Sequence, residues 1–89
     1  MNYVVYILQS LKDGRYYIGH TADMEKRLRA HNSGKVKSTQ KRKPLKLVYR
    51  EEYETKGEAF RREMYLKSAK GYREKKKIVD EIDSGEGIV

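Results

Sequence analysis

Glu63 is the residue of this sequence whose chemistry most needs an explanation. On a helical wheel it falls inside an apolar arc formed by its neighbours Ala59, Phe60, Met64 and Leu66. A carboxylate on a core-facing stripe is costly unless it is paired with, or bound to, a cation. Two explanations stay open: an ion pair with Lys67 or with a basic loop, or a carboxylate that serves the function of the protein.

Arg27 and His31 form a second group. They are four residues apart, so on a helix they share a line that borders the apolar stripe of Met24 and Leu28. Both groups can therefore reach the edge of a neighbouring sheet. The competing interpretation is a solvated arginine and a histidine favoured by the C-terminal end of the helix dipole. The one other histidine is His20, and no His–His–carboxylate spacing exists, so a histidine-built metal site is not expected.

Tyr6 and Tyr17 lie in two strand-like segments that flank the turn signal Asp13-Gly14. An even number of residues in the connection places both tyrosines on one face of an antiparallel pair, and an odd number separates them. Gly19 shares the face of Tyr6, and its missing side chain leaves space beside that phenol. The alternative is ordinary packing, because tyrosines are common in strands.

These side chains need a sheet and helices to position them, and the sequence pattern predicts both. Apolar residues on both faces of 3–8 predict a central strand that is covered on both sides. In chain order we expect strands over 3–8 and 15–19, a helix from Thr21 or Asp23 to His31 or Asn32, a basic loop over 34–44, a strand over 45–50, and helices over 56–69 and 72–82.

The predicted fold is an α/β (α+β) domain over 1–83 with the order ββαβαα. Its three-stranded, mostly antiparallel sheet is flanked by helices. Thr55 and Glu58 have capping-box spacing before the second helix. Tyr72, Val79 and Ile82 are expected to form the buried stripe of the third helix, and residues 84–89 a flexible tail.

Composition narrows the classes of protein to which the chain can belong. The 89 residues form one small domain, and 21 Lys and Arg against 13 Asp and Glu give a net charge of +8. The absence of cysteine excludes disulfide frameworks, zinc knuckles, iron–sulfur clusters and thiol catalysis. No apolar run approaches the ~20 residues that cross a bilayer, and no signal-peptide pattern is present, so we expect a cytoplasmic protein without a membrane partner. The positive charge predicts an anionic partner, most commonly nucleic acid.

The basic residues gather in the loop and in the later helices. The candidates for phosphate contact are Lys35, Lys37, Lys41, Arg42 and Lys43 in the loop, and Arg61, Arg62, Lys67, Lys70, Arg73, Lys75, Lys76 and Lys77 beyond it. A solvated basic face is the usual meaning of such runs, but no acid occurs from 34 to 50, which favours contact with phosphates. Such contacts do not distinguish one base from another.

Together these pieces resemble the GIY-YIG nuclease domain over residues 2 to 80. The first family signature appears in degenerate form as Val4-Val5-Tyr6, and the second is intact as Tyr17-Ile18-Gly19. The family's catalytic arginine matches Arg27, the His-Asn of its small stand-alone branch matches His31-Asn32, and its metal-binding glutamate matches Glu63. The resemblance extends to the N-terminal nuclease domain of the bacterial excision-repair endonuclease and to structure-specific endonucleases of branched DNA.

Three positions depart from the family pattern. Val4 replaces the family glycine, His20 stands where the repair branch often has a lysine, and no asparagine follows Glu63. The first departure affects backbone packing more than chemistry. Together they bear on rate and substrate more than on the class of enzyme.

The resemblance implies an endonuclease that hydrolyses phosphodiester bonds with a single Mg²⁺ or Mn²⁺ ion. Glu63 would hold that ion against the scissile phosphate, and Arg27 would donate hydrogen bonds to the same phosphate. The implied substrate is DNA, branched or flapped, cut during repair or recombination. A targeting protein or a second copy of the chain would direct the enzyme.

The same resemblance implies alternative roles for the two tyrosines, Tyr6 and Tyr17. Either Tyr6 or Tyr17 would orient or deprotonate the attacking water, and the other would hydrogen-bond the phosphate or the first phenol. A phenol has a pKa of ~10, so a basic role needs positive charge nearby, from Arg27, the metal, or His20 or His31. The choice between the two tyrosines, and between DNA and RNA, stays open.

Two other functions compete with this hypothesis. The first is a nucleic-acid-binding module of the same fold with little or no activity, for which a carboxylate aimed at phosphate would be a disadvantage. The second is a basic amphipathic helix over 70–82 that lies on an acidic membrane. The acids Glu74, Asp80, Glu81 and Asp83 weaken the second.

Overall fold

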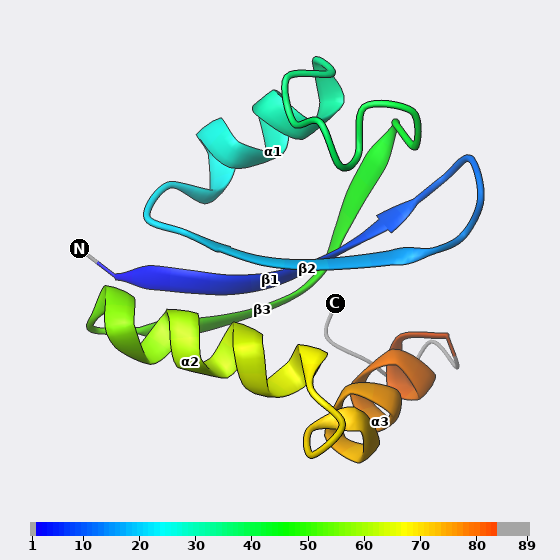
Figure 1. Ribbon diagram of the computed structural model, residues 1–89. Coiled ribbons are helices and arrows are strands. Elements are labelled where there is room, and N and C mark those ends of the chain that lie inside the picture. Colours follow the sequence, from blue (N-terminus) through cyan, green and yellow to red (C-terminus); the bar gives the residue numbers. More distant parts are fainter. Residues whose placement is uncertain (1, 84–89) are drawn as a thin grey trace.

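The computed structural model describes residues 2–83, so the tail predicted over 84–89 lies outside the described residues. Within them the chain forms, in order, β1 (Tyr3–Ser10), β2 (Tyr16–Thr21), α1 (Met24–Asn32), β3 (Leu45–Tyr53), α2 (Lys56–Lys67) and α3 (Tyr72–Asp83) (Figure 1). The predicted order ββαβαα and the α/β class are therefore confirmed. No helix among these residues is both long and apolar enough to cross a membrane.

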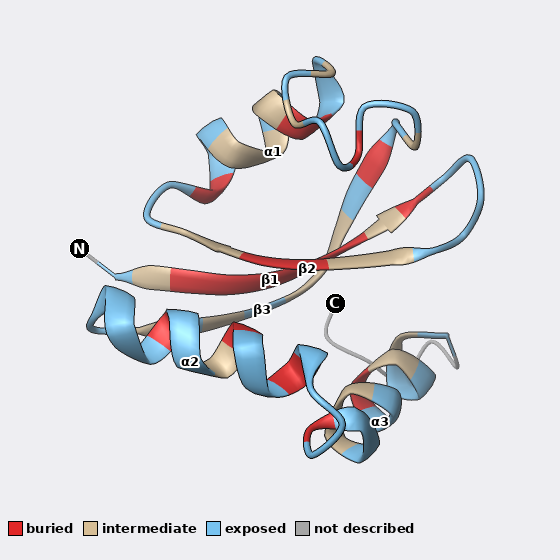
Figure 2. Cartoon of the chain, viewed as in Figure 1, coloured by how far each residue is buried: buried red, intermediate tan, exposed pale blue. Residues whose placement is uncertain are grey.

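β1 is the central strand of the sheet. The three strands of residues 2–83 lie in the order β2-β1-β3, and both pairings are antiparallel. α1 covers one face of the sheet, and α2 and α3 lie on the other (Figure 1). Every side chain from Val4 to Leu8 is buried, as the red segment of β1 shows in Figure 2. This confirms the prediction of a strand covered on both sides.

The alternation of β1 divides the core into two apolar layers. Val5 and Ile7 point toward α2 and α3, where they pack with Leu66 and other buried residues. Tyr6 and Leu8 belong to the opposite layer, on the side of α1. Because successive side chains of a strand alternate, one strand supplies both layers. Tyr6 is the polar member of this run.

The hairpin between β1 and β2 fixes the register of the two strands and so decides which of their side chains share a face. Gly14, at φ +75°, adopts the left-handed conformation that the turn needs. The last paired residues of the two strands are Gln9 and Tyr16, and an even number of residues, 10 to 15, lies between them. Tyr6 pairs with Gly19, and Leu8 pairs with Tyr17. Tyr6 and Tyr17 are therefore on one face of the sheet, as the even-number case predicts.

The loop between α1 and β3 is held at both ends. Asn32 accepts a hydrogen bond from the Leu45 backbone N–H at 2.6 Å and donates to the Leu45 carbonyl at 3.0 Å. The Ser10 hydroxyl donates to the Arg42 carbonyl at 2.5 Å. The end of α1, the start of β3 and the hairpin are thus tied together, and the basic loop sits over this junction.

The predicted apolar stripes of the later helices are partly wrong. On α2 the buried residues are Ala59, Glu63 and Leu66, whereas Phe60 and Met64 are exposed. A three-stranded sheet covers only a narrow stripe of the helix, and Phe60 and Met64 lie to one side of it. On α3 Tyr72, which we expected to be buried, is 55% exposed. Ile78, which the predicted stripe left out, is buried.

An ion-pair network joins β3, α2 and α3. Arg62 donates to both carboxylate oxygens of Glu51, at 2.9 and 3.0 Å, and also bonds Glu74. The capping box predicted for Thr55 and Glu58 is present at the start of α2. Arg62 is half-buried in this network, so its guanidinium is engaged in holding β3, α2 and α3 together.

Gly71 provides a test of the junction between α2 and α3. A Cβ at this position would overlap the carbonyl oxygen of Tyr65 and lie 2.7 Å from its carbonyl carbon. We expect Gly71→Ala to lower the free energy of unfolding by ~1–3 kcal/mol, because backbone must move to relieve the overlap. Thermal denaturation measures the change.

Gly57→Ala is the matched control. Its Cβ would meet only the guanidinium of Arg61, at 3.3 Å, and that flexible side chain can move away. Alanine also favours a helix over glycine by ~1 kcal/mol. We therefore expect Gly57→Ala to keep or raise the melting temperature, and an equal loss in both variants would contradict the steric explanation.

Candidate active site

The site residues predicted from the sequence converge on β2, one of the two edge strands of the sheet described here. Tyr6, Arg27 and His31 approach from the side of α1, and Glu63 approaches from α2 on the opposite face. Lys67 bridges the two sides, because its Nζ pairs with Glu63 and also lies 5.6 Å from the centroid of the Tyr17 ring. An edge strand has no further strand beside it, so groups from both faces can meet there.

A directed chain of hydrogen bonds passes through Tyr6. Arg27 donates its Nε–H to the Tyr6 phenol oxygen at 3.3 Å, and the phenol lies 3.1 Å from His31 Nε2. On its other side, His31 Nδ1 is 2.7 Å from the Thr39 hydroxyl. If Nδ1 carries the proton and donates to Thr39, Nε2 is free to accept from Tyr6, and every member of the chain is satisfied.

Burial sets the protonation states of Tyr6 and His31 in this hydrogen-bond chain. His31 is fully buried, and burial together with the charge of Arg27 lowers the pKa of its imidazole to about 4. Burial also raises the pKa of the Tyr6 phenol, and the hydrogen bond from Arg27 opposes that rise only in part. At neutral pH the pair is therefore a neutral phenol that donates to a neutral imidazole.

Gly19 leaves the space that the Tyr6 phenol occupies. A Cβ at Gly19 would overlap the phenol oxygen and lie 2.6 Å from Cζ of the same ring. Tyr17 completes an aromatic cluster, with its ring centroid 6.4 Å from that of Tyr6 and 5.1 Å from that of His31. Tyr17 is only half-buried, so it is the phenol of the pair that reaches the surface.

Glu63 lies on the other side of β2 with a partner for each carboxylate oxygen. Lys67 Nζ is 2.7 Å from Oε2, and His20 Nδ1 is 2.6 Å from Oε1. Burial acts to raise the pKa of the carboxyl, but the hydrogen bonds from Lys67 and His20 outweigh it and hold the pKa below its usual range. The ion pair that the sequence suggested between Glu63 and Lys67 is thus present. The carboxylate is ionised, and Glu63 is 8% exposed.

This carboxylate can serve a metal ion only as a single protein ligand. Residues 2–83 contain no group of three or more His, Cys, Asp and Glu side chains placed to hold a metal. Mg²⁺ suits such a donor set, because it keeps several waters and takes phosphate oxygens as further ligands. An ionised carboxylate has about four lone-pair directions, so two hydrogen bonds leave room for one ligand bond.

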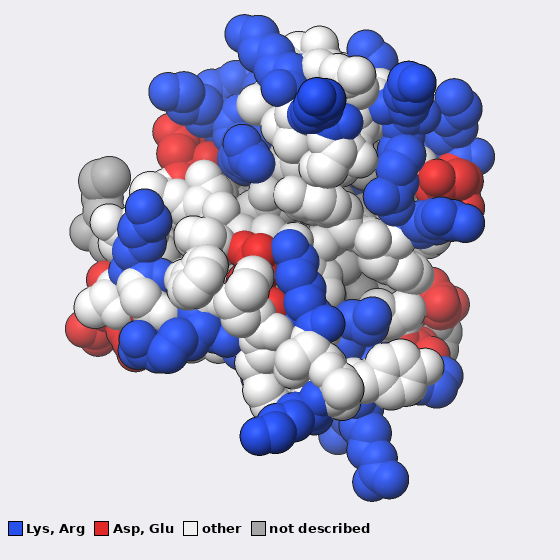
Figure 3. Space-filling model, viewed as in Figure 1, with Lys and Arg blue, Asp and Glu red and all other residues white. Residues whose placement is uncertain are grey.

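The predicted phosphate-contacting residues surround this centre. Lys35, Lys37, Lys41 and Lys43 are exposed in the loop, whereas Arg42 is half-buried and pairs with Asp13 at 3.4 Å. In Figure 3 basic side chains gather above, over α1 and this loop, and below, over α2 and α3. A band with fewer charges lies between the two groups. Lys67 lies at the centre itself, where it neutralises Glu63.

Two contacts of the site were not predicted from the sequence. The partnership of His20 with Glu63 has a weak signal, since alternation along β2 places His20 on the face opposite Tyr17 and Gly19, toward α2. Thr39 is fully buried in the loop and bonds His31, but no periodicity marks a loop residue as buried. Thr39 could be found only from the folded chain.

Comparison with known proteins identifies the family. The family model of the GIY-YIG catalytic domain matches residues 2–77. The chain belongs to the GIY-YIG family. Membership confirms the resemblance found in the sequence. It means that the domain is of a nuclease type whose members generally depend on divalent metal and whose substrate is DNA.

Several small GIY-YIG family members are similar to this chain. A UPF0213 protein of Streptococcus pneumoniae serotype 4 is 48% identical over 67 residues, which cover 74% of this chain and 67% of that protein. The UPF0213 protein YazA of Bacillus subtilis is 34% identical over 88 residues, with coverage of 98% and 88%. The solution NMR structure of the UPF0213 protein BH0048 from Bacillus halodurans, 41% identical, covers 90% of this chain and 84% of that one with a TM-score of 0.52.

The buried His31 predicts a specific dependence of stability on pH. The unfolded chain binds a proton at His31 below about pH 6.5, whereas the folded chain resists until about pH 4, so stability falls as the pH drops through this window. We expect a loss of ~2 kcal/mol between about pH 7 and pH 5 from this group.

His31→Gln removes the titrating group, and its unfolding free energy should change less over the same range. Urea denaturation at each pH measures the difference between the two proteins. Other titrating groups are shared by both proteins and cancel in the comparison. Parallel curves for the native chain and the variant would mean that His31 is not the buried neutral imidazole described above.

Proposed function

We propose that this GIY-YIG protein is a divalent-metal-dependent DNA endonuclease of the cytoplasm that acts on branched or flapped DNA in repair or recombination. The observation that carries the proposal is the pairing of two groups across β2. On one side, Arg27, held by Tyr6, supplies a cation and Tyr17 supplies a phenol at the surface; on the other, the ionised Glu63 supplies a carboxylate. These are the groups that phosphodiester hydrolysis needs.

Arg27 would bind the scissile phosphate. Its Nε–H is given to Tyr6, which fixes the plane of the guanidinium, and its terminal N–H groups can donate to phosphate oxygens. The same guanidinium interacts with both phenols of the cluster, Tyr6 and Tyr17. One residue thereby couples the position of the phosphate to the two tyrosines.

Tyr17 would orient or deprotonate the attacking water, because it is the phenol of the pair that reaches the surface. Arg27 and Lys67 lie near its ring, and their positive charges would stabilise the negative charge that develops there. Tyr6 is fully buried and bonded to Arg27 and to His31 Nε2, so it would position the guanidinium and the aromatic cluster without touching the water.

Glu63 would hold the metal ion, Mg²⁺ or Mn²⁺. When bound, such an ion supplies a Lewis acid that neutralises charge on the phosphate and on the leaving 3′ oxygen. His20 and Lys67 keep the carboxylate ionised and aimed at β2 before the substrate arrives. The exposed lysines of the loop would contact phosphates farther along the DNA, and a targeting protein or a second copy of the chain would select the site of cutting.

A second function is favoured by the ion pairs of Glu63. Because both carboxylate oxygens already have protein partners, Lys67 and His20, Glu63 can also be a structural anion in a domain that binds nucleic acid without cutting it. The two functions differ in a measurable way. A structural anion makes no demand on divalent metal, and its neutral variant loses stability without losing any catalysis.

Cleavage of labelled linear, flapped and four-way DNA by the native chain and by Glu63→Gln tests the proposed function. We expect Mg²⁺-dependent cutting, abolished by EDTA, and a loss of ~10²–10³ in rate in Glu63→Gln. Glutamine keeps the shape of the side chain, and circular dichroism verifies that both proteins are folded. Tyr17→Phe should lose a comparable factor, because it removes the surface hydroxyl proposed to orient or deprotonate the water.

Either of two results would count against this nuclease centre. Cutting that persists unchanged in Glu63→Gln would place the catalysis elsewhere or in a contaminant. Binding without cutting, equal in both proteins and steeply dependent on salt, would favour the binding module.

Lys67→Met distinguishes a metal ligand from a structural anion without any measurement of activity. Removing the ammonium leaves Glu63 buried with one partner fewer, so we expect a loss of ~1–2 kcal/mol in stability without metal. Millimolar Mg²⁺ should restore more of the melting temperature in Lys67→Met than it adds to the native chain, because binding to the folded state stabilises it.

Lys70→Met, at an exposed lysine just beyond α2, is the matched control and should show neither effect. The double variant Glu63→Gln/Lys67→Met should also show no recovery with Mg²⁺. A Lys67→Met protein that melts at one temperature with and without Mg²⁺ would leave Glu63 as a structural anion.

A further inference from the structure

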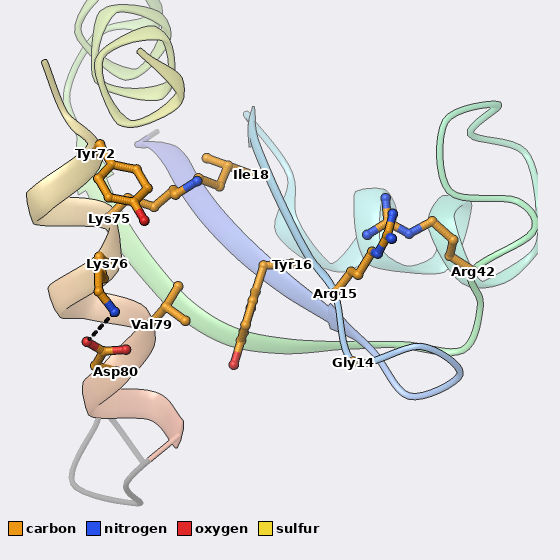
Figure 4. Close-up of a pocket in the computed structure, with 10 residues that line it drawn as sticks. All are labelled: Gly14, Arg15, Tyr16, Ile18, Arg42, Tyr72, Lys75, Lys76, Val79 and Asp80. Atoms are coloured by element: carbon orange, nitrogen blue, oxygen red, sulfur yellow. Dashed lines mark hydrogen bonds and ion pairs between the residues drawn. The ribbon is translucent and has the colours of Figure 1, made fainter. Parts of the chain in front are cut away.

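A cavity opens beside the candidate active site, between the β1–β2 hairpin and α3. Its volume is about 660 Å³, within the range of small-molecule sites. Its lining residues are Gly14, Arg15, Tyr16, Ile18, Arg42, Tyr72, Lys75, Lys76, Val79 and Asp80 (Figure 4). None of them belongs to the chain of Arg27, Tyr6 and His31 or to the surroundings of Glu63.

One end of the cavity is cationic. Arg15 and Arg42 lie together at this end in Figure 4, away from α3. Among residues 2–83 Arg15 takes part in no ion pair, whereas Arg42 pairs with Asp13 at 3.4 Å and its buried Nε makes no hydrogen bond. The acid in the lining, Asp80, is neutralised by Lys76 at 3.4 Å. Two arginines face one carboxylate at this end, so it can accept an anion through Arg15.

The other end is aromatic and apolar. Tyr72 and Lys75 lie here with Ile18, while Tyr16 stands between the two ends (Figure 4). The Tyr72 ring is 55% exposed, and Lys75 Nζ lies 5.6 Å from its centroid. An exposed ring beside a lysine, at the end of an apolar wall, is a platform on which a nucleobase can stack. Burial in the core does not explain a tyrosine at this position.

The cavity continues the line of the active site along β2. Ile18 lines the cavity, and His20, which bonds Glu63, is two residues farther along the same face of the strand. Two residues of a strand span about 6.6 Å. A polynucleotide whose phosphate lies at Glu63 and Arg27 would therefore bring its neighbouring nucleotide to this cavity.

We propose that the cavity is a subsite for one unstacked nucleotide of the strand that is cut. Its base lies on Tyr72 against Ile18 and Val79, and its phosphate faces Arg15 and Arg42. A base inside a duplex is covered on both faces by its neighbours, so only an unpaired nucleotide can enter. The subsite thus deepens the proposed function, on which it rests for the identity of the strand, and it selects unpaired arms at a branch.

Binding measured in EDTA tests the subsite separately from cleavage. A labelled single-stranded oligonucleotide is titrated with the full native chain, with Tyr72→Ala and with Tyr72→Phe. We expect Tyr72→Ala to weaken binding about 5- to 150-fold, the effect of one lost base stack, and Tyr72→Phe to bind as the native chain does. Affinity for a blunt duplex should stay the same in all three proteins.

Tyr65→Ala is the matched control, because Tyr65 is another exposed tyrosine, 40% exposed, outside the lining of the cavity. It should leave the single-strand affinity unchanged. Arg15→Gln provides a second test that does not depend on the aromatic ring. It should reduce the slope of log affinity against log salt by about one, since one phosphate contact is lost.

Three outcomes would overturn the subsite. One is a Tyr72→Ala protein that binds the single strand as tightly as the native chain does. Another is a Tyr72→Ala protein whose affinity falls equally for the single strand and for the duplex, which would make the cavity part of a general phosphate-binding surface. The third is displacement of the oligonucleotide by a free mononucleotide at equal concentration, which would make it a nucleotide-binding site. Because all titrations are made in EDTA, they measure binding even if the protein never cleaves DNA. Failure of the subsite can therefore be distinguished from failure of the proposed nuclease activity.

Discussion

The phenol of Tyr6 sets the constraint on which the candidate active site depends. It lies in the middle of the central strand, fully buried, where no water can satisfy it. An unbonded phenol there would cost ~1–3 kcal/mol, a large share of the stability of a domain this small. Arg27 and His31 supply the missing hydrogen bonds, and Gly19 supplies the space. Arg27, the proposed phosphate ligand, is thus also one of the groups that satisfy Tyr6 in the core.

The same constraint extends into the basic loop. His31 bonds Thr39, which is buried within the loop, and the neighbouring Asn32 bonds the backbone where the loop ends at Leu45. The loop lysines are therefore exposed on a segment that is anchored from inside. The position of the phosphate-contacting charges relative to Tyr6 follows from these bonds, even though the lysines themselves touch nothing of the site.

On the other face of β2, a different requirement governs Glu63. Its carboxylate is on the stripe of α2 that packs on the sheet, so each of its oxygens needs a partner. These partners are Lys67 on its own helix and His20 on β2. The Arg62–Glu51 pair fixes α2 against β3 and so sets the position of Glu63. A site whose halves lie on opposite faces can form only at an edge strand, which gives β2 its importance.

The order of elements, the central strand and the shared face of Tyr6 and Tyr17 could be predicted from the sequence, because they follow from local periodicity and from the parity of one turn. Spacing along a helix likewise gave the Lys67 partner of Glu63. The bonds from Tyr6 to His31 and from Glu63 to His20 join residues 25 and 43 positions apart, and only tertiary packing decided them. The burial of Thr39 and the exposure of Tyr72 had the same origin, since what covers a side chain depends on elements that local pattern does not place.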